Sequence, residues 1–173
     1  DNISEVLEIY YAEKNTYTRI RQKSVDLRKL VNTILERDQK KYVLQQKQLK
    51  DSMKREKYKV YGELINAFGY SLPEDARYLE APNYYDDNKI IKIPLDPTLS
   101  VSENSQKYFD KYGKMKRTSE ALDELLVETK SQIDHLESIQ NSLDIAQNQD
   151  DLEQIRLELV ESGFCLLYTS DAA

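Results

Sequence analysis

The chain has 173 residues, of which 32% are charged and 39% hydrophobic, and it contains only three Phe and no Trp. Because the large aromatic side chains that fill a deep core are scarce, this composition favours long exposed helices with a narrow apolar seam over a compact globule. The net charge of −6 argues weakly against nucleic-acid binding, and the single cysteine, Cys165, excludes an internal disulfide and a cysteine metal cluster.

No stretch of the sequence reaches the roughly 20 apolar residues of a membrane helix, and the acidic start is unlike a secretory signal. We therefore expect a cytoplasmic protein that does not contact a membrane. Since the first residue is Asp1 and not Met, we also expect the chain to be a fragment that begins inside a longer protein.

Residues 1–68 are predicted to form a first long coiled-coil helix. They contain no Pro, and bulky side chains recur three and four positions apart. The seam comprises Ile3, Val6, Tyr10, Tyr17, Ile20, Leu27, Val31 and Ile34 and then, less regularly, Tyr42, Leu49, Met53, Val60, Leu64 and Phe68. Because the register slips beyond Asp38, we leave open whether the helix kinks or breaks near residues 37–41.

Residues 69–99 contain all four prolines and no strong helical period. Within them, residues 83–85 and 90–93 flank the polar stretch 86–89, which predicts a short β-hairpin with a polar turn. A lone hairpin is marginal in water, so we expect it to pack on a neighbouring helix surface.

Residues 100–147 carry the most regular seam and are predicted to form a second coiled-coil helix. Ser100 and Glu103 have the spacing of a capping box, in which a Ser side chain and a Glu three residues later satisfy free N–H groups. The seam comprises Tyr108, Tyr112, Met115, Ser119, Leu122, Leu126, Thr129, Ile133, Leu136, Gln140 and Leu143.

Residues 149–163 are predicted to form a short third helix, with Asp150 as its N-cap signal and Gly163 closing it. Residues 164–173 resemble translated sequencing adapter and are predicted to be a non-native tail. The predicted fold is mainly α, a long antiparallel coiled-coil hairpin. The first helix runs out, a small β-hairpin element follows, and the second and third helices run back.

Charge is distributed unevenly along the chain. Residues 14–59 contain fifteen Lys and Arg against five acidic residues, whereas residues 118–162 contain two against twelve. In the hairpin, residues 14–29 would lie beside residues 141–156, so opposite charges would face each other. Closer to the turn, the charges that face each other are both positive. Solvent screening is one explanation, because exposed charges cost little at cellular salt. An RNA-binding surface is the other.

The RNA-binding hypothesis assigns phosphate contacts to cationic side chains near the turn. Contacts of this kind position a protein on RNA without reading its sequence, and they weaken steeply with salt. The nine residues assigned to this role are Lys54, Arg55, Lys57, Lys59, Lys107, Lys111, Lys114, Lys116 and Arg117.

Four strings resemble segments of the NFACT family of ribosome quality-control factors, the group of RqcH and NEMF that is also called fibronectin-binding protein A. Residues 59–67 (KVYGELINA), 82–85 (PNYY), 93–100 (IPLDPTLS) and 102–112 (SENSQKYFDKY) look like that family's "K-x-x-GELL-x-AN", "NYY" and "I-x-LDP-x-LSPSENAQ-x-YFKKY" patterns. The last match is long and specific. Within this stretch, Ser105 stands where Ala is usual, and Val101 where Pro is usual.

The resemblance covers roughly residues 7–163 and implies the middle coiled-coil region of such a factor. It implies that the protein acts in protein biosynthesis, on large ribosomal subunits blocked by peptidyl-tRNA. Its implied partners are rRNA and a stalk-base protein and, through the full-length protein, tRNA recruited for C-terminal alanine tails. The Asp-Arg residues tied to tail synthesis belong to a domain that precedes this region, so that role has no counterpart here.

No catalytic, cofactor-binding or metal-binding constellation is expected, so the chain is predicted not to be an enzyme and to need no cofactor. His135 is the only histidine. The tyrosine pairs at 10–11 and 84–85 could stack on bases or pack on helix surfaces. Two alternative functions remain open: a structural coiled-coil spacer, which predicts parallel dimers where the arm predicts a monomer, and a fibronectin-binding surface adhesin.

Overall fold

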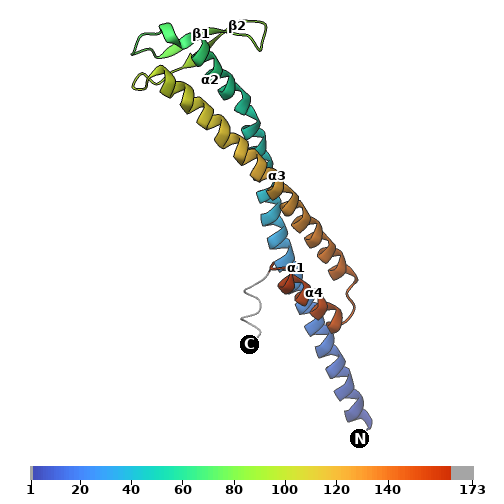
Figure 1. The fold of residues 1–173 in the computed structure, drawn as a ribbon. Coiled ribbons are helices and arrows are strands. Elements are labelled where there is room, and N and C mark those ends of the chain that lie inside the picture. Colours follow the sequence, from blue (N-terminus) through green and yellow to red (C-terminus); the bar gives the residue numbers. More distant parts are fainter. Residues whose placement is uncertain (1, 165–173) are drawn as a thin grey trace. The chain divides into compact units, whose positions relative to one another are not determined.

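The computed structural model describes residues 2–164 and is mainly α, as predicted (Figure 1). A small β-hairpin separates the two long helical stretches, and a short helix follows them. The elements are α1 (Asn2–Ser52), a 3₁₀ turn (Met53–Arg55), α2 (Glu56–Phe68), a second 3₁₀ turn (Gly69–Ser71), β1 (Tyr78–Asn83), β2 (Lys89–Pro94), α3 (Val101–Ile145) and α4 (Gln149–Glu161). None of the helices in the described range is long and apolar enough to cross a membrane.

Contacts within the chain divide it into two compact units. Unit 1 takes its residues from 1–43 and 128–173, and unit 2 comprises Leu44–Val127. Each unit contains one stretch of α1 and one stretch of α3, together with the smaller elements that pack on them.

In unit 1, α1 and α3 pack in opposite directions. Arg28 Nη1 lies 2.5 Å from Asp144 Oδ1, and Asn32 Oδ1 accepts a hydrogen bond of 2.6 Å from Gln140 Nε2, so advancing along α1 means retreating along α3. The Arg28–Asp144 pair also confirms, at this position, the expected meeting of basic and acidic stretches. Three helices share the core, which consists of Leu27, Val31, Ile34, Leu35, Ile133, Leu136, Ile139, Leu143, Leu152, Ile155 and Leu159.

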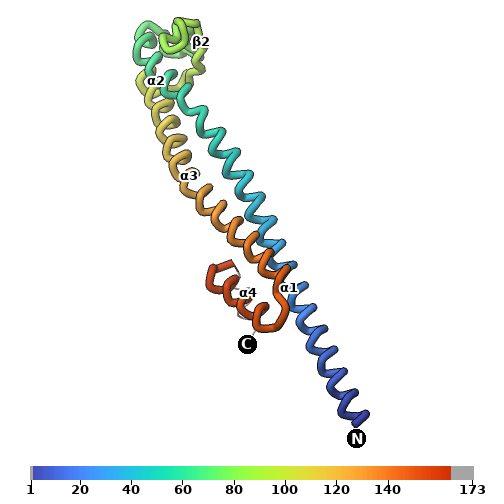
Figure 2. Tube along the Cα trace, turned by 90° about the vertical axis from the view of Figure 1, so that its right-hand side faces the viewer, coloured from blue at the N-terminus to red at the C-terminus, as the bar shows by residue number. Residues whose placement is uncertain are grey.

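The direction of α4 differs from the prediction. Rather than continuing along α1, α4 turns back beside α3 (Figure 2). Two contacts show this: His135 Nε2 lies 2.6 Å from Glu158 Oε1, and the His135 ring contacts that of Phe164. The N-cap is also not Asp150. The extended backbone of Asn148 lets its side chain accept a hydrogen bond from Asp151 N, at 2.9 Å, immediately after the loop that reverses the chain.

The C-terminal end of α4 is the predicted one. Gly163 has a left-handed φ of +76° and donates to Val160 O, while Phe164 N donates to Leu159 O, which together form a Schellman motif. Phe164 packs against the unit 1 core, so this first residue of the predicted non-native tail belongs to the described fold. The remainder of that tail, residues 165–173, lies outside the described residues.

The helix is continuous where a break was considered, because α1 passes through residues 37–41 without interruption. Leu35 and Asp38 are both buried where the register slips, and the α-helix is interrupted only later, at the 3₁₀ turn Met53–Arg55.

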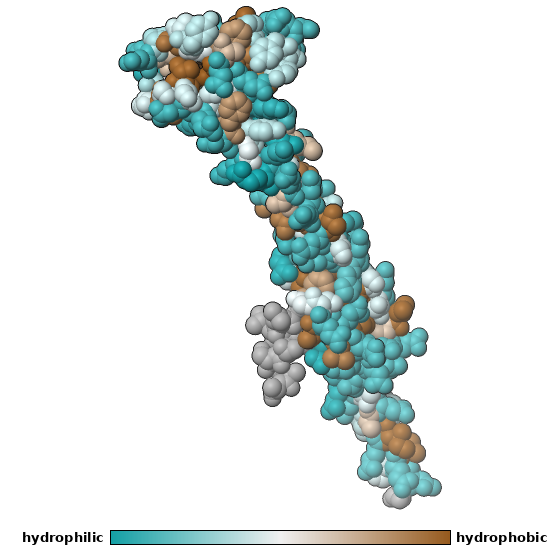
Figure 3. Space-filling view, viewed as in Figure 1, coloured by the Kyte–Doolittle hydropathy of each residue, from teal (hydrophilic) through white to brown (hydrophobic). Residues whose placement is uncertain are grey.

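Because α4 folds back, the first part of the α1 seam is uncovered. Ile3 is 76% exposed and Tyr17 is 67% exposed, and Figure 3 shows hydrophobic surface near this end of the helix.

In unit 2, the β-hairpin packs on α2 and on the beginning of α3. Leu79 and Ala81 of β1 and Ile93 of β2 are buried with Leu64 and Ile65 of α2. The predicted hairpin is present, but its first strand is Tyr78–Asn83 and not residues 83–85. Pro82 lies inside that strand, where it is tolerated because every strand of a two-stranded sheet is an edge strand.

The predicted capping box at the start of α3 is confirmed. Glu103 N donates to Ser100 Oγ at 3.1 Å, and Ser100 N donates to Glu103 Oε1 at 3.5 Å. One turn later, Ser105 Oγ donates to the buried carbonyl of Gly62 at 3.0 Å, which connects α3 to α2. These contacts fix the position at which α3 leaves the loop, and they thereby set the orientation of the lysines that follow.

Candidate nucleic-acid interface

The nine cationic residues predicted to bind RNA all lie in unit 2, on two helical stretches that face each other. Residues 44–59 contain six Lys and Arg against two acidic residues, and residues 107–117 contain five against one. The two stretches face each other because Arg55 Nη1 lies 3.4 Å from Ser119 Oγ and Lys59 Nζ lies 5.8 Å from the Tyr112 ring centre. The structure therefore brings these nine residues to one region of the unit.

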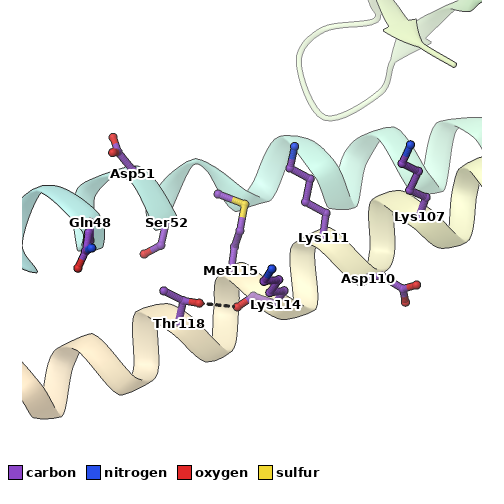
Figure 4. Close-up of a pocket in the computed structure, with 9 residues that line it drawn as sticks. All are labelled: Gln48, Asp51, Ser52, Lys107, Asp110, Lys111, Lys114, Met115 and Thr118. Carbon is purple, nitrogen blue, oxygen red and sulfur yellow. Dashed lines mark hydrogen bonds between the residues drawn. The ribbon is translucent and has the colours of Figure 1, made fainter. Parts of the chain in front are cut away.

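Three of the predicted residues, Lys107, Lys111 and Lys114, line one groove with a volume of about 730 Å³ (Figure 4). Their spacing of four and three positions places them on one side of α3. Met115 reaches from α3 toward the other helix, and the opposite wall comes from the end of α1, with Gln48 and Ser52.

The two acidic residues at this groove are directed away from it. Figure 4 shows Asp51 pointing away from α3, and Asp110 pointing away from α1 and α2. Asp51 lies 3.7 Å from Lys54, and Asp110 accepts a hydrogen bond of 2.8 Å from Gln106, so both carboxylates have other partners. The groove consequently presents a cationic rim.

Tyrosine rings extend the cationic region toward the hairpin. Tyr58 of α2 stacks on Tyr108 of α3 at 6.0 Å, and Tyr61 meets Tyr108 edge to face at 5.3 Å. Lys111 Nζ lies 4.3 Å from the Tyr58 ring centre, and Lys57 Nζ lies 5.0 Å from it. Hydrogen bonding to Lys111 lowers the pKa of Tyr58, an effect that burial partly opposes, whereas burial raises the pKa of Tyr108.

The lysine at the hairpin end of the groove is partly neutralised. Lys107 Nζ lies 3.8 Å from Asp96 Oδ2, and hydrogen bonds from the hydroxyl and backbone N–H of Thr98 hold the pKa of Asp96 below its ordinary value, with the Lys107 charge adding to the effect. Asp96 thus stays ionised beside Lys107. At the other end, Lys114 forms no ion pair within residues 2–164, and neither do Lys116 and Arg117.

Arg55 is placed differently from the other eight. Its side chain is half-buried between the helices, where Nη1 lies 3.4 Å from both Ser52 O and Ser119 Oγ, and its Nε is buried without a hydrogen-bond partner among residues 2–164. These contacts give Arg55 a packing role. A heptad pattern cannot reveal this, because it fixes the face of the helix but not the conformation of a long side chain.

Gln48, Ser52, Met115 and Thr118 also line the groove, and sequence reasoning did not predict them as site residues. Met115 was correctly placed on the seam, but no signal showed that small or polar side chains would oppose it.

The structure also describes the metal-ligating residue types and the tyrosine pairs considered in the sequence. Among the described residues no cluster of metal-ligating side chains exists. Tyr10, Tyr11, Tyr84 and Tyr85 are all about half exposed or more, and the Tyr85 hydroxyl donates to the Glu63 carboxylate on α2.

Comparison with known proteins gives consistent results. The profile of the family described as NFACT N-terminal and middle domains matches residues 1–171. The protein named Rqc2 homolog RqcH from Streptococcus suis (strain 05ZYH33) is 35% identical over 164 residues, which cover 95% of this chain and 29% of that protein. The protein of the same name from Bacillus subtilis (strain 168) is 32% identical over 165 residues, again 95% of this chain and 29% of that protein.

A solved structure is also similar. The C-terminal part of the fibronectin/fibrinogen-binding protein from Streptococcus suis matches with 30% identity and a TM-score of 0.56, over 85% of this chain and 45% of that one. The chain thus spans less than half of that structure and only 29% of the length of the curated relatives named above.

Proposed function

Because the chain belongs to the NFACT family, we propose that it is the middle coiled-coil arm of a ribosome quality-control factor and has no enzymatic activity of its own. In this proposal the arm contacts the large ribosomal subunit in the cytoplasm. Domains outside this chain would engage peptidyl-tRNA and recruit tRNA for C-terminal alanine tailing.

The observation that supports this proposal is the cationic region of unit 2. Eleven Lys and Arg side chains, six from residues 44–59 and five from residues 107–117, lie on facing helices with three acidic residues among them. Like charges gathered on facing helices repel one another, so a partner of opposite charge would favour their placement together. A phosphate backbone is such a partner, and it binds through released counterions without regard to sequence.

The test is binding of the chain to purified large subunits by co-sedimentation at several salt concentrations. Changing Lys114, Lys116 and Arg117 together to Glu should lower affinity at least about tenfold and reduce the slope of log affinity against log salt by about 2 to 3. The matched control changes three exposed cations of unit 1, Lys14, Arg19 and Arg21, to Glu. Equal losses in both triple variants, or no loss in either, would overturn the assignment of the interface.

The packing within each unit favours an arm over the spacer alternative. Arg28 with Asp144 in unit 1, and Gly62 with Ser105 in unit 2, pair the helices of a single chain in opposite directions. A parallel dimer would need those helix faces for a second molecule. Sedimentation equilibrium of the chain should therefore give a monomer mass.

Fibronectin binding is a second candidate, and the name of the solved relative from Streptococcus suis is what favours it. It is tested with immobilised fibronectin and the same two triple variants. Binding that is tight and indifferent to the changes at Lys114, Lys116 and Arg117 would support an adhesive role separate from the cationic region.

A further inference from the structure

The groove lined by Lys107, Lys111 and Lys114 has features that a phosphate-binding surface alone does not need. The site is an open groove with a volume of about 730 Å³. That volume lies in the range of sites that bind small organic groups. Something smaller than a duplex fits inside it.

The lining indicates what that group is. Met115 is the one apolar residue among the lining residues, so an amphipathic helix, which needs a row of apolar anchors, would find a single contact. A nucleobase needs less apolar surface, because it presents two flat faces and polar edges. Thioether sulfur is polarisable and makes favourable contacts with aromatic rings.

The polar groups of the groove suit the edges of a base. Gln48 is exposed and has no hydrogen bond in the described structure, so its amide offers donors and an acceptor. The hydroxyls of Ser52 and Thr118 donate to Leu49 O and Lys114 O, which leaves their oxygens as acceptors. Gln48, on the wall opposite the lysines, therefore presents both kinds of hydrogen-bonding group.

The three lysines are positioned to contact the phosphates of an RNA strand that carries such a base. Lys107 and Lys114 are seven residues apart on α3, a distance of about 10 Å along the helix axis, with Lys111 between them. Asp51 and Asp110 point outward (Figure 4), and the carboxylate that meets the rim is that of Asp96, beside Lys107 at the hairpin end. We propose that this groove binds unpaired RNA nucleotides, with a base against Met115 and Gln48 and the neighbouring phosphates on the three lysines. The inference rests on the proposed ribosomal function and names the part of RNA that the arm contacts.

The first experiment compares a short fluorescently labelled single-stranded RNA with a duplex of the same sequence, by anisotropy with the whole chain at fixed salt. The single strand should bind at least about tenfold more tightly if a base must enter the groove, since this difference corresponds to about 1.4 kcal/mol, within the range of one stacked base. Equal affinity for both would overturn the proposal, as would binding of an acidic peptide that displaces the RNA.

A matched pair of variants tests the groove itself. Gln48→Glu places a negative charge inside it, whereas Gln46→Glu places the same charge on an exposed position of α1 outside the groove lining. We expect Gln48→Glu to weaken single-strand binding about tenfold, because it places a negative charge beside the RNA phosphates. Gln46→Glu should change affinity less than about twofold. Equal effects would show that only net charge matters, which refutes the groove.

The outcome is separable from that of the ribosome test. Loss of subunit binding in the triple variant at Lys114, Lys116 and Arg117, combined with equal affinity for single and double strands, would leave the proposed interface standing and remove the groove from it. Photo-crosslinking of a thiouridine-containing single strand gives an independent readout. Adducts should map to peptides that contain Gln48 or Met115, and adducts confined to the β-hairpin would contradict the proposal.

Discussion

The ring of Phe109 in α3 lies directly against Gly62 in α2, so closely that a Cβ at position 62 would be 2.8 Å from the ring atoms Cε2 and Cζ. Gly62 is buried, and its carbonyl accepts the Ser105 hydrogen bond. A glycine is therefore required here by the close approach of two helices. This contact sets the spacing of α2 and α3 beside the cationic region.

Gly62→Ala should consequently destabilise the chain by about 1–3 kcal/mol, the usual cost of forcing extra volume into a packed site. Urea unfolding followed by circular dichroism measures it. Gly113→Ala is the matched control, because among residues 2–164 a Cβ there would meet only the end of the Arg117 side chain, at 3.4 Å. A helical alanine without a clash should stabilise by about 0.5–1 kcal/mol. Equal behaviour of the two variants would contradict the close packing of α2 against α3.

The Ser100 cap offers a second matched pair. Ser100→Ala removes the acceptor of the Glu103 N–H bond and should destabilise the chain by about 1 kcal/mol. Ser102→Ala changes the same residue type two positions later, on an exposed site inside the helix. It should be neutral or slightly stabilising, because Ala is the better helix former. If thermal unfolding showed the larger loss for Ser102, the cap would be misassigned.

Arg55 and Lys57 are predicted to separate folding from binding. Arg55→Ala removes the contact with Ser119 and should lower the free energy of unfolding by about 1 kcal/mol. Lys57→Ala removes an exposed cation and should leave stability within about 0.5 kcal/mol while weakening RNA binding. Unfolding and anisotropy measured on the same samples test both statements. An Arg55 variant that loses binding without losing stability would return this residue to the interface.

Asp96 gives a pH-dependent prediction. Its folded pKa is below the ordinary value of 3.8, chiefly through the Thr98 hydrogen bonds and then through Lys107. The carboxylate therefore stabilises the fold at neutral pH, and this contribution is lost as pH falls from near 3.8 through the lowered folded pKa. Carboxyl NMR titration should show a larger rise in the Asp96 pKa for Thr98→Val than for Lys107→Gln. The reverse order would mean that the lysine charge dominates.

The heptad pattern predicted the seam of α3 well, because every one of its members is buried or half-buried, from Tyr108 to Leu143. The Ser100 cap and the Gly163 terminus could also be predicted from the sequence, since each depends only on residues close to it in the chain. The direction of α4 could not be predicted, because the apolar face of a helix does not determine which neighbouring helix covers it. The groove was missed for a related reason. A repeat places Met115 toward a partner, but the space beside it depends on Ser52 and the 3₁₀ turn that follows.

The uncovered start of α1 has a consequence for local opening of the backbone. From Asn2 to Tyr17 the helix has exposed side chains and no tertiary cover among the described residues, whereas from Leu27 onward the seam is buried. An isolated helix of this length is marginal in water, so its amide protons should exchange with solvent at opening free energies near zero. Mass spectrometry should show deuterium uptake that declines steeply between Ile20 and Val31, where α1 enters the three-helix core. The first five turns thus open independently of the cooperative unfolding of that core.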